Sequence, residues 1–171
     1  MPSLFKKGQH PNFNLLKKEQ VLDAKSEKAI KDILKKYKKV AILGSFNSGK
    51  DNLKQACLEF YHKLHKLPVI LPSIEVNSLG SFFNTPTWKK YAKILNQNLP
   101  SIFAISHRAH LYNADSYYNK FNKFDALIDI RKLPNGKQIV YQVLVHSNGN
   151  WKATYVNEQF FIQCGHKIIA A

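Results

Sequence analysis

The chain has 171 residues, a length that suits one domain with a hydrophobic core of its own. Lysine and arginine number 26 against 11 aspartates and glutamates, a formal net charge of +15, and only Arg108 and Arg131 are arginines. Such an excess of positive charge favours an anionic partner, and lysine contacts phosphates more readily than it reads bases. The two cysteines, Cys57 and Cys164, exclude a disulfide framework or a cysteine-rich zinc site, and no apolar run is long enough to span a membrane.

The N-terminal part predicts an arm followed by a helix. Residues 1–20 contain two prolines, one glycine and no apolar periodicity, which is typical of an extended basic arm that becomes ordered on a partner. From Asp23 onward, apolar residues recur at helical spacing and lysines occupy much of the remaining surface. That lysine-covered surface is either a solvated helix face or a phosphate contact.

A strand–helix–strand passage comes next. Val40–Leu43 is an apolar run that predicts a short buried strand, and a turn over Gly44–Asp51 follows it. Asn52–Lys66 predicts a helix with one apolar side. Pro68–Pro72 predicts a second strand, which its two prolines confine to an edge position or to a short length.

Residues 101–130 predict two strands, Ile102–Ser106 and Ala126–Ile130, joined by a long polar loop. The loop exceeds the two to five residues of a tight hairpin connection, and long loops held by rigid strands often carry function. It combines cations, flat rings and amides, which are the groups that RNA-binding surfaces use; the alternative is an ordinary surface loop. Before it, residues 73–100 predict an insertion with a short helix around Trp88–Leu95.

The C-terminal part predicts further strands. Leu133–Gly136 is a turn signal, and Ile139–His146 alternates in part as a strand does. Ser147–Asn150 predicts a hairpin turn, after which Trp151–Val156 and Phe160–Gln163 are short strand candidates.

The segment Gly44–Lys50 has the G-x-x-x-x-G-K spacing of a phosphate-binding loop, after a predicted strand and before a predicted helix. In such loops a serine or threonine follows the lysine and binds magnesium. Here Asp51 holds that position and Asn52 follows it, so a carboxylate would face the phosphate oxygens. A nucleotide-binding α/β domain is therefore an alternative interpretation.

Metal-site and nuclease patterns are incomplete. Two pairs of histidines lie close in sequence: His62 with His65, and His107 with His110. Neither pair has an acidic or cysteine residue spaced to complete a metal site. Asp125 or Asp129, followed by the strand around Gln142, resembles the acid and acid-x-Lys pattern of metal-dependent nucleases, but that strand holds neither a carboxylate nor a lysine.

Two short motifs carry a family resemblance. His107–Leu111 reads His-Arg-Ala-His-Leu after a strand, and Leu127–Ile130 reads Leu-Ile-Asp-Ile. They match in order the Arg-Ser-Pro-His-Val and Leu-Ile-Asp-Ile of the small-subunit ribosomal protein S-ten family, which the chain resembles over Lys39–Val145. His110 falls on the loop histidine of that family, and Leu133–Gly136 is similar to its closing Leu-Pro-x-Gly turn.

The resemblance implies an α+β fold: a ferredoxin-like two-layer sandwich with a mostly antiparallel sheet, a long protruding hairpin loop, and N- and C-terminal extensions. We therefore expect the chain to consist of a basic tail and amphipathic helix over 1–38, followed by a single domain over 39–146. Within that domain lie the insertion 73–100 and the long hairpin 101–130, and a C-terminal extension covers 147–171.

The function that the resemblance implies is a structural constituent of the small ribosomal subunit head. Such a protein binds rRNA and neighbouring head proteins through its hairpin and lysine-rich surface, and catalyses nothing. The alternatives are a nucleotide-binding α/β domain using Gly44–Lys50 and a free-standing RNA-binding module. We expect no cofactor, no metal, no membrane contact and no small-molecule substrate.

The expected RNA contacts are cations, rings and amides of the long loop and the basic arm: Arg108, His110, Tyr112, Asn113, Tyr117, Tyr118, Lys120, Lys123, Lys6 and Lys7. A composition rich in Lys, Asn, Phe, Ile and Tyr is typical of proteins from A+T-rich genomes, organellar ones among them. We therefore expect a mitochondrial ribosome, with another organellar or a bacterial-type ribosome as the alternative.

Overall fold

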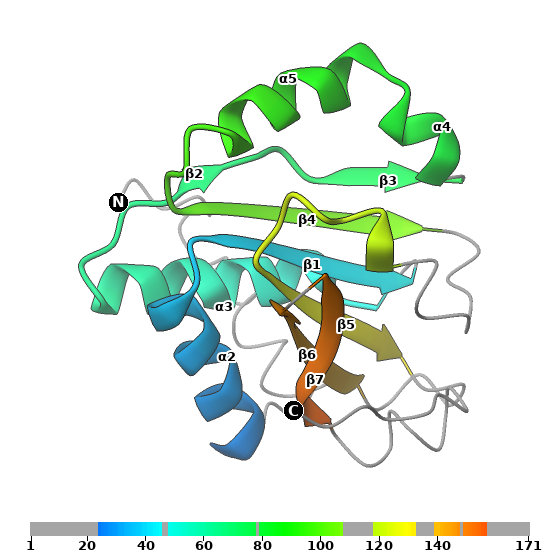
Figure 1. The fold of residues 1–171 in the computed structure, drawn as a ribbon. Coiled ribbons are helices and arrows are strands. Elements are labelled where there is room, and N and C mark those ends of the chain that lie inside the picture. Colours follow the sequence, from blue (N-terminus) through cyan, green and yellow to red (C-terminus); the bar gives the residue numbers. More distant parts are fainter. Residues whose placement is uncertain are drawn as a thin grey trace, which may run out of the picture.

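The computed structural model describes residues 24–45, 48–77, 79–107, 118–132, 139–147 and 149–156. These residues form helices on a mixed seven-stranded sheet (Figure 1). The helices are α2 (Ala24–Lys36), α3 (Lys50–Lys63), α4 (Leu79–Phe83) and α5 (Pro86–Leu95). The strands are β1 (Lys39–Ser45), β2 (Val69–Ile70), β3 (Ile74–Val76), β4 (Ser101–His107), β5 (Ala126–Lys132), β6 (Ile139–Ser147) and β7 (Asn150–Val156). The expected α+β class is confirmed in this coarse form.

Strand β1 occupies the centre of the sheet, whose order is β2-β4-β1-β5-β6-β7 with β3 beside β4. It runs parallel to both neighbours, so that Val40 pairs with Ile102 of β4 and with Ala126 of β5. Strands β2 and β3 are parallel to β4, whereas β6 and β7 extend the other end of the sheet antiparallel. The unbroken apolar run of β1 suits this place, because a central parallel strand is covered on both faces.

The prediction of a long hairpin over 101–130, and with it of a mostly antiparallel sheet, is wrong. Strands β4 and β5 do not pair with each other but lie on either side of β1, each parallel to it. Two parallel strands need a crossover of about a dozen residues or more, and the segment between His107 and Ala126 is long enough to supply one. The length that suggested a protruding loop therefore belongs to a connection that returns across the sheet.

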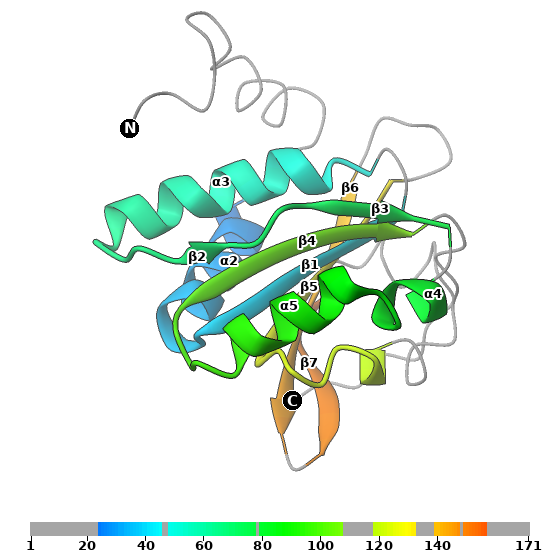
Figure 2. The same ribbon diagram turned by 90° about the horizontal axis from the view of Figure 1, so that it is seen from above.

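Two separate cores lie on the two faces of the sheet, because alternate residues of each strand point to opposite sides. On the aliphatic face, α2 and α3 pack on Val40, Ile42, Ile102, Ala104, Ala126, Ile128, Ile130, Val143 and Val145. On the aromatic face, α4, α5 and the turn 118–124 pack on Ala41, Leu43, Phe103, Ile105, Leu127, Leu144 and Trp151. Figure 2 shows α3 on one side of the strands and α4 and α5 on the other. Helices thus cover both faces, where the S-ten resemblance implied one.

The segments expected to be a tail, an insertion and a C-terminal extension contribute to the core or to the sheet of the domain. Ile30 and Leu34 of α2 are fully buried, so this helix belongs to the aliphatic core rather than to a tail. The insertion 73–100 supplies β3 and the two helices of the aromatic face. Strand β7 pairs with β6 and extends the sheet, so the domain continues beyond residue 146. The predicted strand Phe160–Gln163 lies outside the described residues.

Local sequence explains where several helices begin and end. Thr85 is the N-cap of α5: its hydroxyl accepts a hydrogen bond from the Trp88 N–H at 3.2 Å, and Pro86 opens the helix, where the missing N–H costs nothing. At the C-terminal end of α2, the Lys66 ammonium donates to the carbonyls of Leu34 and Lys35 at 2.9 and 2.7 Å. This lysine ties the end of α2 to the segment after α3, since cations favour helix C-termini.

Candidate nucleic-acid interface

A cavity of about 470 Å³ opens on the aromatic side of the molecule, between α4, the start of α5 and the turn before β5. Rings, amides and lysines line it: Gly80, Phe83, Asn84, Trp88, Asn119, Lys120, Asn122 and Lys123. None of these described lining residues carries a carboxylate. The cavity therefore presents hydrogen-bonding and positively charged groups around an aromatic wall.

The turn 118–124 positions one side of this cavity. Tyr118, Phe121 and Phe124 are buried at every third position, while the residues between them are exposed. Two backbone hydrogen bonds repeat this spacing, from the Phe121 N–H to the Tyr118 carbonyl at 2.9 Å and from the Phe124 N–H to the Phe121 carbonyl at 3.0 Å. In a helical turn of three residues, every third side chain lies on the same side. The lysines and asparagines between the rings consequently face outward.

A buried hydrogen bond anchors the same turn to the sheet. The Tyr118 hydroxyl donates to the Asp129 carboxylate of β5, and both residues are almost completely buried. A carboxylate inside a protein needs such a partner, because its transfer from water is costly. Tyr118 thus holds the turn against β5 and fixes the positions from which Lys120 and Lys123 extend into solvent.

Helices α4 and α5 supply the opposite wall. The Phe83 ring lies 4.9 Å from Trp88 and 5.4 Å from Phe121, edge to face in both pairs. Trp88 also lies 6.3 Å from Phe124, so rings from three segments form one cluster. Edge-to-face packing restrains aromatic rings and is favourable beyond the area that they bury. Phe83 remains partly exposed at the cavity and offers a fixed apolar surface.

This set of groups suits an unpaired nucleotide better than a duplex groove. Unstacked RNA bases pack on aromatic side chains, amides hydrogen-bond to base edges, and lysines contact phosphates. Lys123 reaches across to α5, where its ammonium donates to the Asn96 side-chain oxygen at 3.4 Å on the exposed surface. The cation is thus held beside the cavity without a carboxylate to neutralise it in this contact.

Of the residues predicted to contact RNA, the structure brings Lys120 and Lys123 to the cavity. The prediction for Tyr118 is wrong, because its side chain is 2% exposed and its hydroxyl bonds to a buried carboxylate. The other predicted contacts lie outside the described residues: Arg108, His110, Tyr112, Asn113, Tyr117, Lys6 and Lys7.

Sequence reasoning missed the wall formed by the insertion. Phe83, Asn84 and Trp88 follow one another within a few residues of Thr85, which is a good helix N-cap. A ring pair and an amide around a helix start were a usable signal. They were overlooked because 73–100 has no counterpart in the family that the chain resembles.

The turn between β1 and α3 has part of the geometry of a phosphate-binding loop. Gly49 is the N-cap of α3 with φ 90° and ψ 23°, a left-handed conformation that favours glycine, and its carbonyl accepts from the Leu53 N–H at 3.0 Å. A Cβ on Gly44 would lie 2.4 Å from the Ser48 hydroxyl oxygen and 3.2 Å from the Ile130 carbonyl oxygen, so a side chain here would displace the Ser48 hydroxyl. The backbone conformation therefore favours glycine at position 49, and close packing favours it at position 44.

The lysines that follow this turn at the start of α3 have their partners within the chain. Lys50 is 5% exposed, and its ammonium forms an ion pair with the Asp51 carboxylate at 2.9 Å. Its neighbour Lys54 donates to the Leu71 carbonyl and the Ser73 hydroxyl, both at 2.9 Å. Burial lowers the pKa of Lys54, with Lys50 adding to the effect and Asp51 opposing it. The buried Ser48 hydroxyl has no hydrogen-bond partner among the described residues.

The acidic residues considered for a nuclease have structural roles. Asp129 bonds to Tyr118, and the Asp125 carboxylate accepts from the Lys39 backbone N–H at 3.1 Å at the start of β1. Across the described ranges, no three His, Cys, Asp or Glu side chains come close enough to hold a metal ion. The same ranges contain no helix with the length and apolar character needed to cross a bilayer.

Comparison with protein-family models gave no matching family, and comparison with curated proteins gave no match. The geometry of the described residues is therefore the ground for assigning a binding site.

Proposed function

We propose that the protein is a non-catalytic RNA-binding component of a ribosome. The observation that carries the proposal is the cavity between α4, α5 and the turn 118–124, where lysines and amides surround the Phe83 ring with no carboxylate among its described lining residues. A net charge of +15 supplies the long-range attraction to RNA, and this cavity supplies a place where a base and its phosphate fit together.

The proposed binding mode is capture of a single unpaired nucleotide. Its base packs on Phe83, its edge meets Asn84, Asn119 or Asn122, and its phosphates meet Lys120 and Lys123. Since lysine reads bases poorly, recognition depends on an accessible base more than on its identity. The protein therefore binds loops, bulges and ends of a folded RNA.

The proposal that the protein belongs to a ribosome rests on the resemblance to the S-ten family. The fold places β4 and β5 on either side of β1, so the proposal does not depend on a hairpin reaching between rRNA helices. It depends on the exposed lysines and the aromatic cavity instead. Small-subunit placement and a mitochondrial particle are the finer parts of the proposal and rest on sequence motifs and composition.

The proposed cavity is tested with Phe83→Leu, which removes the flat ring and keeps an apolar side chain. Loss of one base-stacking ring should weaken binding of a short single-stranded RNA by about 1–3 kcal/mol. The matched control is Tyr37→Leu, which removes a partly buried ring on the aliphatic face. Fluorescence anisotropy should show weaker binding for the first variant alone. Equal affinities of the two variants would contradict the proposed site.

The ribosomal assignment is tested by sedimentation of the native protein through a high-salt sucrose gradient. Co-sedimentation with the small subunit is the expected result. Recovery with the large subunit would keep the ribosomal function and remove the S-ten assignment. Recovery only at the top of the gradient would overturn the ribosomal proposal. It would not bear on RNA binding, which the anisotropy measurement tests separately.

A second candidate function is nucleotide binding at Gly44–Lys50. One specific observation favours it: the turn joins a strand to a helix, has a left-handed Gly49, and holds a buried Ser48 hydroxyl without a partner. Against it, Asp51 already neutralises Lys50. Titration calorimetry with ATP and GTP in the presence of magnesium separates the two. Binding that Lys50→Met abolishes and Lys54→Met retains would favour this candidate, and absence of heat would exclude it.

A further inference from the structure

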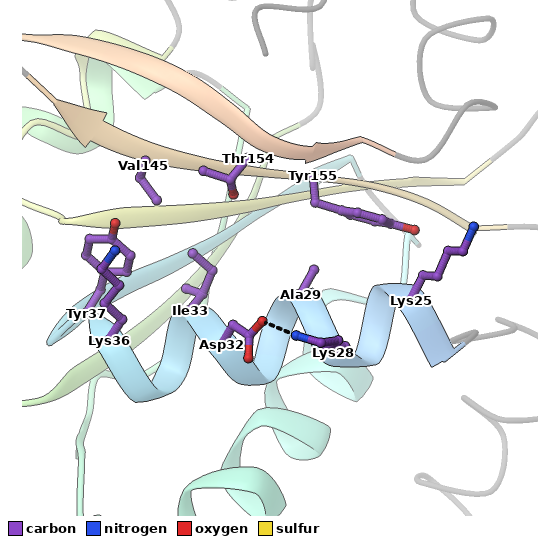
Figure 3. A pocket seen from close by; sticks show the side chains of 10 residues that line it. All are labelled: Lys25, Lys28, Ala29, Asp32, Ile33, Lys36, Tyr37, Val145, Thr154 and Tyr155. Atoms are coloured by element: carbon purple, nitrogen blue, oxygen red, sulfur yellow. Dashed lines mark hydrogen bonds and ion pairs between the residues drawn. The ribbon is translucent and has the colours of Figure 1, made fainter. Parts of the chain in front are cut away.

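A second hollow lies on the opposite face of the molecule, between α2 and the strands β6 and β7 (Figure 3). Its volume is about 400 Å³. Its lining residues are Lys25, Lys28, Ala29, Asp32, Ile33, Lys36, Tyr37, Val145, Thr154 and Tyr155. This lining shares no described residue with the aromatic cavity or with the phosphate-loop-like turn, so the groove is separate from both. We call it the α2 groove.

The floor of the α2 groove is apolar and incompletely covered. Ala29, Tyr37 and Tyr155 pack against the aliphatic core yet remain partly exposed, and Ile33 and Val145 form the base between them. The Tyr155 ring lies along the groove in Figure 3, and its hydroxyl is hydrogen-bonded to Ser26 at 2.8 Å. This contact joins β7 to α2 and fixes the ring. A fixed apolar floor with charged edges is the form of a helix-binding groove.

Lysines mark the open side of the groove. Lys25, Lys28 and Lys36 line it against a single carboxylate, Asp32. Asp32 already forms an ion pair with Lys28 at 2.9 Å, and the described residues give Lys25 and Lys36 no carboxylate partner. At its two ends the groove therefore has two positive charges that no carboxylate of the described residues neutralises. A second copy of this chain, with net charge +15, is a poor occupant on electrostatic grounds.

The shape of the floor distinguishes a peptide from a nucleotide. Its centre is aliphatic, formed by Ala29, Ile33 and Val145, and its two tyrosines lie toward opposite ends (Figure 3). The tyrosine rings lie at the ends, and the aliphatic centre between them suits the aliphatic side chains of a peptide better than it suits a base. Lys25 and Lys36 are about 16 Å apart along the helix at 1.5 Å per residue, which is about three helical turns. Three turns of a docked helix match that length.

We propose that the α2 groove is the docking site of an acidic amphipathic helix from a partner protein. Apolar side chains at positions i, i+3 or i+4 and i+7 of that helix fill the floor over Ala29 and Ile33. Aspartates or glutamates on its flanks meet Lys25 and Lys36. The protein thus carries two recognition surfaces of different chemistry, one on each face of its sheet.

The test uses a display library of random 18-residue peptides, selected on the full chain in the presence of competitor RNA. Enriched peptides should share apolar residues at helical spacing flanked by Asp and Glu. The affinity of one such peptide, measured by anisotropy, should fall at least about tenfold in Lys25→Glu/Lys36→Glu. The matched control Lys35→Glu/Lys38→Glu makes the same charge change at exposed positions outside the groove and should retain affinity within about twofold.

An uncharged change separates groove docking from general attraction to a basic surface. Ala29→Gln fills the floor at a partly exposed helix position, where glutamine is a good helix former, and should also weaken the peptide. Equal losses of affinity in the two double variants, or full binding by Ala29→Gln, would overturn the proposal. It would also be overturned if single-stranded RNA displaced the peptide and bound less tightly to Lys25→Glu/Lys36→Glu but not to the control, because the occupant would then be nucleic acid.

Discussion

The two faces of the sheet are built from different side chains, although the same strands supply both. The aliphatic face buries isoleucines, leucines and valines under α2 and α3. The aromatic face buries Phe82, Trp88, Tyr91, Phe103, Tyr118, Phe121, Phe124 and Trp151 under shorter and less regular elements. Large rings bury more area per residue, so a few of them hold together a layer made from two short helices and a turn.

That difference in construction bears on recognition. Rings that pack edge to face leave part of an aromatic surface open at the cavity, as Phe83 does. Aliphatic side chains under a regular helix leave a smooth groove along that helix, as Ile33 and Ala29 do. We expect the first surface to meet bases and the second to meet apolar side chains.

The largest expected effect comes from adjacent residues of β4 that face opposite cores. Phe103 is fully buried and lies within 6.5 Å of four other rings, whereas Ile102 is fully buried on the aliphatic side. Phe103→Ala should lower the free energy of unfolding by about 3–5 kcal/mol. Ile102→Ala should lower the same free energy by less than Phe103→Ala does, although buried Ile→Ala changes span about 2–5 kcal/mol. Urea denaturation measures both, and an equal or larger effect at Ile102 would contradict the stabilising role given to the rings.

Two buried tyrosines sharpen the comparison. Tyr118→Phe removes a hydrogen bond to the buried Asp129 and should cost about 1–3 kcal/mol of unfolding free energy. Tyr61, on the aliphatic face, has a buried hydroxyl without a partner in the described structure, and burial raises its pKa. Tyr61→Phe should therefore be neutral or slightly stabilising. Similar melting temperatures for the two variants would mean that the Tyr118 bond does not anchor the turn.

A smaller effect is expected on RNA affinity from the lysines of the two faces. Lys120→Gln/Lys123→Gln should weaken binding of single-stranded RNA by about tenfold and reduce the salt slope by roughly 0.7 for each phosphate that is no longer bound. Lys35→Gln/Lys38→Gln removes the same charge outside both proposed sites. The slope, measured between about 50 and 200 mM salt, should change more for the first pair. Identical slopes would indicate diffuse attraction to the whole surface.

The smallest effect concerns the start of α5. Thr85→Ala removes the N-cap hydrogen bond to Trp88 and should cost about 1 kcal/mol. The same variant loosens the wall that holds Phe83, so a modest decrease in RNA affinity should accompany it. Thr85→Ser keeps the cap hydroxyl and should restore both quantities. If serine failed to restore them, the threonine methyl group rather than the cap would be responsible.

Much of the local structure could be predicted from the sequence, because it depends on neighbouring residues. Apolar periodicity predicted α2 and most of α3, and apolar runs predicted β1, β4 and β5. Strand pairing could not be predicted in the same way. Whether β4 pairs with β5 or both flank β1 depends on contacts between distant residues, and the motif match favoured a hairpin. Two observations pointed to the observed order: the crossover length of 108–125 and the apolar character of Val40–Leu43 on both faces.

The candidate site was predicted in part for a related reason. Lys120 and Lys123 were identified from composition, since exposed lysines beside rings are visible in one stretch of sequence. The three-residue spacing of Tyr118, Phe121 and Phe124 was not used, although it separates buried rings from exposed polar residues. Phe83 and Trp88 could not be joined to that stretch without knowledge that α4 and α5 lie against it.

The central place of β1 also constrains how the chain is made. Of the strands in the described part of the chain it is the first to leave the ribosome that synthesises it, yet its two neighbours are β4 and β5, which emerge much later. Until then the apolar strand β1 has neither edge paired, and such unpaired edges associate with other chains. Loop closure over so many residues makes folding slow compared with that of helical domains. We therefore expect the positive charge of α2, five lysines against Glu27 and Asp32, to act before any partner is bound, by keeping nascent copies apart until β4 and β5 have been made.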